Sequence, residues 1–250
     1  MKPRSRRPIS QAAAPAKNAS GTVRINKHMA DIGLASRREA DEMVAKGSVF
    51  VNGKPAVMGM QIDPKKDKVT LKGKKPSYVY YMYNKPMGIV TTGPQGDEVD
   101  ILEDVKFPVP VFPVGRLDKE SHGLILMTND RRITHRLLDP SSEHEKEYRV
   151  TLAKGVTGSF IKKLEHGMIV DGERTKSTKV SRESNTTFRI VLTEGKNRQI
   201  RKMVEAAGDS VVDLLRLRIE HIKIGDLQEG AFKSIPKAEL ALLLKKLRLN

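Results

Sequence analysis

The residue best placed for chemistry is Asp118, a carboxylate in a turn rich in glycine and charge. The turn runs from Gly115 to Gly123, and it leads into the apolar run 124–127, which is typical of a buried strand. The flanking cations Arg116 and Lys119 favour the ionised carboxylate. An ionised Asp at the mouth of a rigid strand is suited to act as a nucleophile or a base. The alternative is that Asp118 makes only the local hydrogen bonds usual for Asp in turns.

A tyrosine follows in the string His144-Glu145-Lys146-Glu147-Tyr148, where another strand is expected to begin. The chain has five tyrosines and no tryptophan, so an aromatic side chain near a functional site is informative. Tyr148 has two interpretations. It is half-buried packing at a strand start, or it stacks on a nucleic-acid base, which contributes about 1–3 kcal/mol per base.

Basic residues recur in the string 195–203, which is expected to form a helix. Its apolar residues follow helical spacing: Ile200, Met203, Val204 and Ala207. At about 100° per residue, Arg201 lies roughly 60° from Val204, at the margin of the apolar face. Arg201 is therefore expected to reach a partly buried carboxylate, while Arg198 and Lys202 are left for phosphate groups. A solvated basic face is the alternative.

The composition indicates a polyanionic partner. The chain of 250 residues has a net charge of +16 and a pI near 9.9, which favours nucleic acid. An acidic membrane surface is the alternative, but no basic amphipathic helix with bulky apolar anchors supports it. Because there is no cysteine, disulfides and thiolate metal sites are excluded.

Neither a metal nor a nucleotide cofactor is indicated by any motif. His144-Glu145 begins like a zinc-protease signature, but Tyr148 stands where the second histidine is needed. No apolar run reaches the roughly 18 residues of a membrane span, and the basic first residues lack the apolar core of a secretory signal. We therefore expect a cytoplasmic protein that binds no cofactor, no metal and no membrane. No exposed apolar stripe calls for an oligomeric partner, so a monomer is expected.

The chain divides by composition into four parts: a basic arm (1–21), a small unit (22–72), a linker (73–77) and a larger unit (78–250). The arm has no acidic residue and too little apolar surface to fold alone, so disorder is expected. Both an inert tail and a role in attracting RNA fit the arm.

The small unit is expected to contain two short helices followed by short strands. The first helix is closed by Gly33, and the second begins at a capping box of Ser36 and Glu39 and stops at Gly47. The Asn52-Gly53 pair predicts a hairpin. The cations of interest in this unit are Lys27, Arg37, Arg38 and Lys46. They either grip phosphates or form a solvated helix face.

The larger unit mixes strand-like runs with irregularly interspersed helical patterns, which is typical of an α+β fold with a mainly antiparallel sheet. Strands are expected near 78–83, 111–114, 124–127, 148–152, 188–192 and 219–224. Helices are expected near 132–138, 159–166, 198–207 and 237–247. The last helix repeats leucine on one face, which predicts a core contact: Leu240, Leu243, Leu244 and Leu247.

The strings together resemble the pseudouridine synthases of the RsuA family, whose members join an S4 domain to a catalytic domain. The small unit is similar to the S4 RNA-binding domain in three segments: 25–27, 36–40 and 51–53. The larger unit is similar to the catalytic domain in four segments: 115–118, 121–130, 146–148 and 198–201. Arg131 departs from the family pattern, which has glycine after Asn129-Asp130, and this alters the turn after the strand.

The resemblance implies a reaction and a role for each residue. A uridine is flipped out of its stack and isomerised to pseudouridine, which requires neither cofactor nor metal. Asp118 would be the essential carboxylate, either attacking C1′ or removing the C2′ proton, and the sequence leaves both routes open. Tyr148 would stack on the flipped base, and Arg201 would pair with Asp118. Leu214 matches a family position that packs against the site, and plain core packing fits it equally well.

The resemblance also implies an RNA partner. The cations expected to contact RNA are Lys27, Arg37, Arg38, Lys46, Arg116, Lys196, Arg198 and Lys202. Three segments are most similar to family members that act on large-subunit (23S) ribosomal RNA: 36–41, 123–125 and 144–148. That RNA is the expected substrate, with a tRNA as a second one. The alternatives are the same chemistry on a tRNA anticodon loop or on 16S rRNA, and a non-catalytic S4-type RNA-binding or ribosome-assembly factor.

Overall fold

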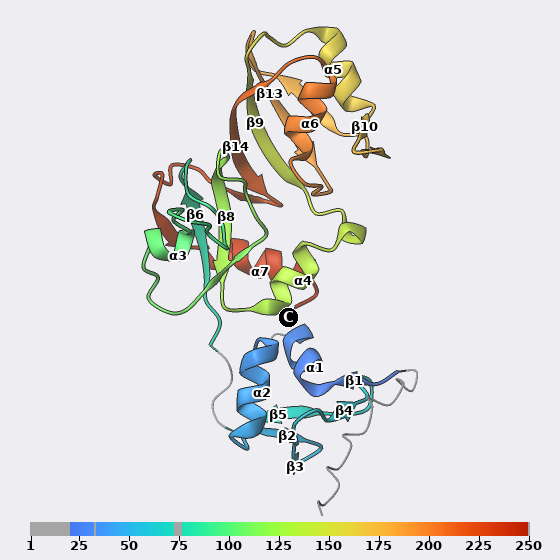
Figure 1. Cartoon of the computed structure of the whole chain (residues 1–250), viewed down its shortest axis with the longest axis vertical. Helices are drawn as coiled ribbons and strands as arrows, with labels where there is room; N and C mark the ends of the chain where they lie inside the picture. Colours follow the sequence, from blue (N-terminus) through green and yellow to red (C-terminus); the bar gives the residue numbers. More distant parts are fainter. Residues whose placement is uncertain (1–20, 33, 73–76, 250) are drawn as a thin grey trace, which may run out of the picture. The chain divides into compact units, whose positions relative to one another are not determined.

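The computed structural model describes residues 21–32, 34–72 and 77–249. Most of the expected arm and linker, and Gly33 at the expected end of the first helix, lie outside these residues. The described chain forms two compact units, a smaller one within residues 21–72 and a larger one that contains residues 77–249 (Figure 1). Across the described ranges, no helix is long and apolar enough to cross a membrane.

The smaller unit contains the two helices and the hairpin that the sequence predicts. Its elements are β1 (Val23–Arg24), α1 (Ile25–Asp31), α2 (Arg37–Ala45), β2 (Val49–Val51), β3 (Lys54–Pro55), β4 (Gln61–Ile62) and β5 (Val69–Leu71). Strand β2 pairs with β3 and β5, and β1 pairs with β4, all antiparallel.

The local signals of this unit are confirmed in detail. Ser36 Oγ accepts a hydrogen bond from the Glu39 amide at 3.1 Å, and the Glu39 carboxylate accepts one from the Ser36 amide at 2.6 Å. The capping box therefore satisfies two amides at the start of α2. Asn52 and Gly53 have φ values of 51° and 79°, which the two-residue turn between β2 and β3 requires.

The larger unit is built on one mixed sheet. Its strands are β6 (Tyr80–Lys85), β7 (Phe112–Val114), β8 (His122–Thr128), β9 (Lys146–Leu152), β10 (Ile169–Val170), β11 (Glu173–Arg174), β12 (Lys179–Arg182), β13 (Thr187–Leu192), β14 (Val211–Ile219), β15 (Ile222–Lys223) and β16 (Phe232–Ser234). Its helices are α3 (Ile101–Asp104), α4 (Arg131–Leu137), a 3₁₀ helix (Pro140–Ser142), α5 (Gly158–Glu165), α6 (Gln199–Ala206) and α7 (Lys237–Lys246).

Nine strands form the sheet, in the order β12-β13-β9-β14-β8-β6-β16, with β15 beside β14 and β7 beside β8. All neighbours are antiparallel except β14 and β8, which run parallel. The remaining strands, β10 and β11, form a separate hairpin. This arrangement confirms the predicted α+β fold with a mainly antiparallel mixed sheet.

The two halves of the sheet have separate hydrophobic cores. Helices α5 and α6 flank the half that contains β9, β13 and β14 (Figure 1), with Phe160, Phe188 and Met203 in the core between them. Helices α4 and α7 pack with β6 and β8 in the other half. Leu243 in α7 and Leu247 at its C-terminal cap are buried. The other two leucines of the predicted face are partly buried against the same core, so the predicted leucine face is confirmed.

The two halves meet where β8 and β14 run side by side. Only two residue pairs define this parallel contact, Leu215 with His122 and Arg216 with Gly123. Gly123 has φ +106°, and a Cβ atom there would lie 2.5 Å from the main-chain oxygen of Arg216. The strands can approach this closely only because residue 123 is glycine.

The strand predicted at 219–224 is confirmed only in part. The structure has the end of β14 at Ile219 and the short strand β15 at Ile222–Lys223, and the rest of β14, a nine-residue strand that begins at Val211, was not predicted. Charged residues interrupt its apolar pattern: Asp213, Arg216 and Arg218. Each of these side chains has a hydrogen-bond or ion-pair partner within the larger unit, which allows charged residues in a largely buried strand. The residue after β14, Glu220, has φ +52° and turns the chain into the short strand β15.

Candidate active site

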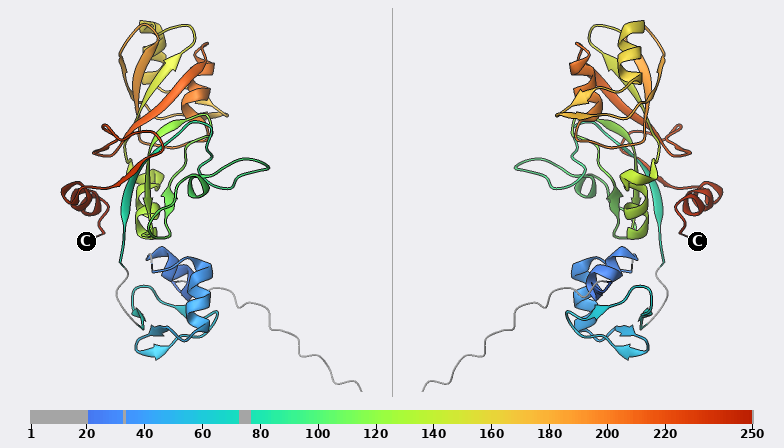
Figure 2. Two further views of the ribbon diagram at one scale, coloured as in Figure 1. Left: turned by 90° about the vertical axis from the view of Figure 1, so that its left-hand side faces the viewer. Right: turned by 90° about the vertical axis from the view of Figure 1, so that its right-hand side faces the viewer.

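Asp118 lies in the turn between β7 and β8, at the junction of the two sheet halves. It lines a cleft of about 310 Å³ together with the turn residues 116–120, residues from the connection between β6 and β7, and Arg198 before α6. That connection, which includes α3, extends away from the sheet (Figure 2). The side chain of Asp118 is 33% exposed, so it is held by the turn and open to a substrate.

The main chain of the turn is fixed at each residue from Arg116 to Ser121. The donors to its six carbonyl oxygens, in chain order, are Arg216 Nη1 (3.4 Å), Thr91 Oγ1 (2.6 Å), the Ser121 amide (3.0 Å), the Gly88 amide (2.8 Å), Arg201 Nη2 (2.9 Å) and Lys85 Nζ (2.8 Å). A carboxylate on so constrained a turn is oriented before a substrate arrives.

Arg198, rather than Arg201, lies beside the carboxylate. Its Nη1 atom is 2.9 Å from Glu120 Oε2 and 3.6 Å from Asp118 Oδ2. The hydrogen bond to Glu120 raises the pKa of Arg198 and lowers the pKa of Glu120. The predicted pairing of Asp118 with Arg201 is therefore not the arrangement in this structure. Arg198 has φ +50° and lies before the first turn of α6. The direction of its side chain therefore cannot be inferred from the 100° spacing of helical residues.

Arg201 binds the main chain of the turn and not the Asp118 carboxylate. Its Nη2 atom donates to the main-chain oxygen of Glu120 at 2.9 Å and lies 3.3 Å from Ser121 Oγ. Its Nη1 atom donates to the main-chain oxygen of Val211 at 3.5 Å. Arg201 thus connects α6 and the start of β14 to the Asp118 turn.

Tyr148 and Leu214 lie in β9 and β14, and neither lines the cleft that contains Asp118. Tyr148 is in β9, is half-buried, and packs against the core clusters of both sheet halves. Leu214 is 5% exposed and belongs to the core beneath α5 and α6, where Tyr148 also packs. Core packing is therefore what the structure shows for Leu214, and its packing against the site stays a prediction.

Lys85 is a site residue that the sequence predictions omitted. It is fully buried at the end of β6, and its amine donates to the main-chain oxygens of Ser121 at 2.8 Å and Pro86 at 2.7 Å. Burial lowers the pKa of Lys85 to about 8, although Asp118 and Glu120 oppose this shift. The available signal was a lysine directly before a proline at the end of a buried strand.

The lowered pKa of Lys85 predicts a pH effect on stability. Its pKa rises from about 8 in the folded chain to its ordinary value of 10.5 on unfolding, so the unfolded chain binds more protons between these values and stability rises with pH. We expect the free energy of unfolding of the wild-type larger unit, measured relative to that of Lys85→Met, to increase by about 1.5 kcal/mol between about pH 8 and about pH 9.5. Urea unfolding followed by tyrosine fluorescence measures this, since all five tyrosines lie in the larger unit. A difference that does not change with pH would contradict it.

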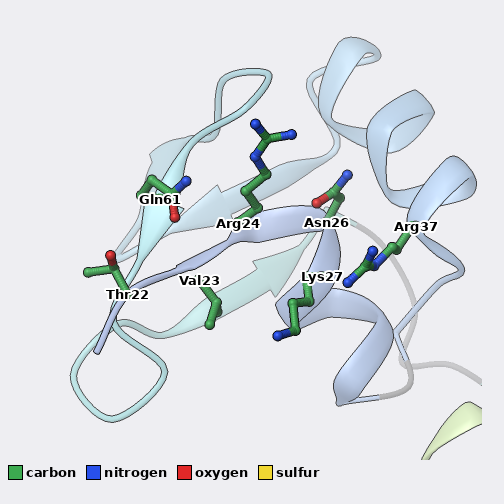
Figure 3. Close-up of a pocket in the computed structure, with 7 residues that line it drawn as sticks. All are labelled: Thr22, Val23, Arg24, Asn26, Lys27, Arg37 and Gln61. Carbon is green, nitrogen blue, oxygen red and sulfur yellow. The ribbon is translucent and has the colours of Figure 1, made fainter. Parts of the chain in front are cut away.

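The predicted RNA-binding cations fall into separate groups. Lys27 and Arg37 line a basic pocket of about 250 Å³ in the smaller unit (Figure 3). Arg24, which was not predicted, lines the same pocket. Lys46 is outside this lining and lies 3.9 Å from Glu42. Arg38 is exposed and does not line the pocket either.

In the larger unit, Arg116 and Arg198 line the cleft with Asp118. Lys196 and Lys202 instead bind acids of the hairpin segment, Glu173 and Asp171 respectively. The described residues contain no group of three or more histidine, aspartate or glutamate side chains arranged to hold a metal ion.

Comparison with known proteins identifies the family. Residues 79–206, more than half of the chain, match the family model described as RNA pseudouridylate synthase, and residues 23–64 match the S4 domain. The chain belongs to the RNA pseudouridine synthases. The predicted fold of an S4 domain followed by a synthase domain is confirmed.

Curated relatives cover almost the whole synthase. The dual-specificity RNA pseudouridine synthase RluF of Escherichia coli K12 is 40% identical over 230 residues, spanning 90% of this chain and 79% of that protein. An uncharacterized RNA pseudouridine synthase of Bacillus subtilis, YtzG, is 34% identical over 234 residues, spanning 88% of this chain and 98% of that protein. A crystal structure of a pseudouridylate synthase matches 88% of this synthase and 99% of its own chain, with a TM-score of 0.67 and 28% identity.

Proposed function

We propose that this synthase converts a uridine of large-subunit (23S) rRNA to pseudouridine, with Asp118 as the essential carboxylate. The observation that carries the proposal is the fixed turn that presents Asp118 to a cleft also lined by Arg116 and Arg198. The reaction breaks the N1–C1′ bond, rotates the uracil and joins C5 to C1′, while C5 loses its proton to solvent and N1 takes up a proton in its place. The product is an isomer of the substrate and no electrons are exchanged with another molecule, and the proposal includes neither metal nor cofactor.

Each residue has a defined part in this proposal. Asp118 attacks C1′ or removes the C2′ proton, and the open geometry of the cleft serves both routes. Tyr148 stacks on the flipped uracil and compensates for part of the few kcal/mol lost on unstacking. Arg198 neutralises charge beside the carboxylate and contacts RNA phosphate, while Arg201 holds the turn. This assignment moves the partner of Asp118 from Arg201 to Arg198.

A second substrate is favoured by one comparison. The relative from Escherichia coli that is 40% identical is named a dual-specificity synthase. We therefore include a tRNA as a second substrate of the same cleft, with the enzyme acting as a monomer in the cytoplasm, where both RNAs occur. Modification of 16S rRNA is the competing proposal.

Tritium release separates these substrates. Transcripts of 23S rRNA, 16S rRNA and tRNA made with 5-tritiated uridine lose tritium to water when C5 joins C1′. We expect about one tritium equivalent from 23S rRNA in the presence of EDTA, and release from tRNA but not from 16S rRNA. Release from 16S rRNA alone would overturn the substrate assignment, and dependence on added metal would overturn the metal-free reaction.

The pocket in the S4 unit predicts a salt effect. If Lys27 and Arg37 hold RNA phosphates, replacing both with Gln should reduce the slope of log affinity against log salt by about 1.5, since each phosphate contact contributes about 0.7–0.9. Lys66→Gln is the matched control, because Lys66 belongs to the same unit, is exposed and pairs with Asp63 at 3.7 Å outside the pocket. Filter binding across salt concentrations measures the slope. Equal slopes for the double variant and the wild type would contradict a phosphate contact in this pocket.

A further inference from the structure

Arg216 is a buried arginine to which the proposed reaction assigns no part. It lies in the middle of β14 and is 3% exposed. Its direct partner in the neighbouring antiparallel strand is Tyr148, and its partner in the parallel strand is Gly123. Because directly paired residues project to the same face of a sheet, the Arg216 side chain emerges beside Tyr148.

The guanidinium of Arg216 joins three segments. Its Nε atom donates to the main-chain oxygen of Leu124 in β8 at 2.6 Å. Its Nη1 atom donates to the main-chain oxygen of Arg116 at 3.4 Å, two residues before Asp118. One planar group therefore connects the strand beside Tyr148, the first residues of β8 and the Asp118 turn.

The guanidinium of Arg216 is not neutralised by a nearby carboxylate in the part of the chain that the structure describes. Among the described residues Arg216 forms no ion pair, and its Nη2 atom is buried without a protein partner. Burial is the main cause of the lowered pKa of the Lys85 amine, and the charge of Arg216 adds to the lowering. Burying an unpaired cation is unfavourable, so the position calls for an explanation other than stability.

Arg216 lies at the junction of the two sheet halves, and this location suggests its role. The two sheet halves meet through only two parallel residue pairs, and one member of those pairs is Gly123, which adds no side chain to the contact. Asp118 belongs to the half with β8, whereas Tyr148 belongs to the half with β9. A shift of one half against the other at this junction would therefore change the distance between Asp118 and Tyr148.

We propose that Arg216 is a positioning residue that sets the separation of Asp118 from Tyr148 by binding the main chain on the Asp118 side of the junction. The proposal rests on the proposed function, because it takes Asp118 and Tyr148 as the residues that act on the uridine. Arg216 is too buried to touch RNA, so it acts through the turn and through β8. The guanidinium is required because a lysine amine lacks the fork that reaches both carbonyl oxygens.

Single-turnover tritium release with excess enzyme tests this role in the full chain. The rate constant reports the geometry of folded molecules, whereas the amplitude reports how many molecules are folded and competent. For Arg216→Lys we expect a rate constant reduced by about 100-fold, the scale expected when reacting groups are misplaced by about 1 Å. Arg216→Met, which removes the charge as well, should be at least as slow. RNA affinity should change by less than about twofold, since the residue does not contact RNA.

Arg218 supplies the matched control on the same strand. It binds Glu147 at 2.7 Å and Glu145 at 3.0 Å and makes no contact with the Asp118 turn. Arg218→Lys and Arg218→Met should lower the melting temperature and leave the rate constant of tritium release unchanged. An Arg216→Lys variant that loses only amplitude, with a wild-type rate constant, would show a merely structural role and overturn the proposal.

The same experiment separates this inference from the proposed function. If the wild type and the Arg218 variants release tritium and Arg216→Lys does so at the same rate, only the positioning role fails. If the wild type releases no tritium from rRNA or tRNA, the proposed function fails and the positioning role falls with it. The two Arg216 variants also discriminate between charge and shape: a wild-type rate constant for Arg216→Lys beside a slow Arg216→Met would assign the role to charge and overturn the assignment to the fork.

Discussion

Replacing Asp118 with Asn is expected to abolish tritium release while leaving RNA binding intact. The amide has the shape of the carboxylate but is neither a nucleophile nor a base, so turnover should fall on the order of 10³-fold or more. Binding should change by less than about twofold, because the fixed main chain of the turn and the hydrogen bond from Arg198 to Glu120 at 2.9 Å do not involve the replaced atoms. Single-turnover release and filter binding measure the two quantities separately.

Glu120→Gln is the matched control for Asp118→Asn. It removes the neighbouring carboxylate, which is 58% exposed and shares Arg198 with Asp118. We expect turnover to remain within about tenfold of the wild type, since Glu120 is not the acting group and an exposed ion pair is worth little. If Asp118→Asn retained turnover while Glu120→Gln lost it, the two carboxylates would have to exchange roles.

Replacing Gly123 with Ala is expected to destabilise the larger unit by more than about 3 kcal/mol. The added Cβ would lie 2.5 Å from the main-chain oxygen and 2.7 Å from the main-chain nitrogen of Arg216, at a backbone φ of +106° that alanine rarely adopts. The close atoms belong to the main chain of β14, so no side-chain movement relieves the contact. Urea unfolding monitored by tyrosine fluorescence measures the loss.

Gly158→Ala is the control for this substitution. Gly158 begins α5, and a Cβ atom there would meet nothing within 4 Å. Alanine at that site should leave stability unchanged or raise it by about 0.5 kcal/mol. A loss below about 1 kcal/mol for Gly123→Ala would show that the junction yields easily and is not a rigid support for the site.

The sequence predicts most of the local structure because the relevant signals are local. The capping box at Ser36 and Glu39, the Asn52-Gly53 turn and the leucine face of α7 each depend on residues close in the chain, and each is confirmed. Strand β14 is the exception, because local signals do not predict it. Its charged residues are satisfied by partners far along the chain, such as Leu124 for Arg216, so no nearby pattern marks it as a buried strand.

The candidate site was only partly predictable for the same reason. The Asp118 string indicates a carboxylate at the mouth of a strand, but which arginine meets it depends on one backbone angle. Arg198 has φ +50°, which breaks the helical geometry that favoured Arg201. Lys85 and Arg216 donate hydrogen bonds to main-chain oxygens of the turn. Every residue type has a main-chain oxygen, so no residue pattern in the sequence predicts these contacts.

Modification of large-subunit rRNA through Asp118 is best tested by pseudouridine mapping at single-nucleotide resolution. Total RNA is compared among a strain that lacks the gene, the same strain restored with the wild-type chain, and the same strain restored with Asp118→Asn. We expect that a pseudouridine in 23S rRNA disappears on deletion, returns with the wild-type chain and stays absent with Asp118→Asn. An unchanged 23S rRNA map after deletion, or restoration of the missing site by Asp118→Asn, would show that the assignment is wrong.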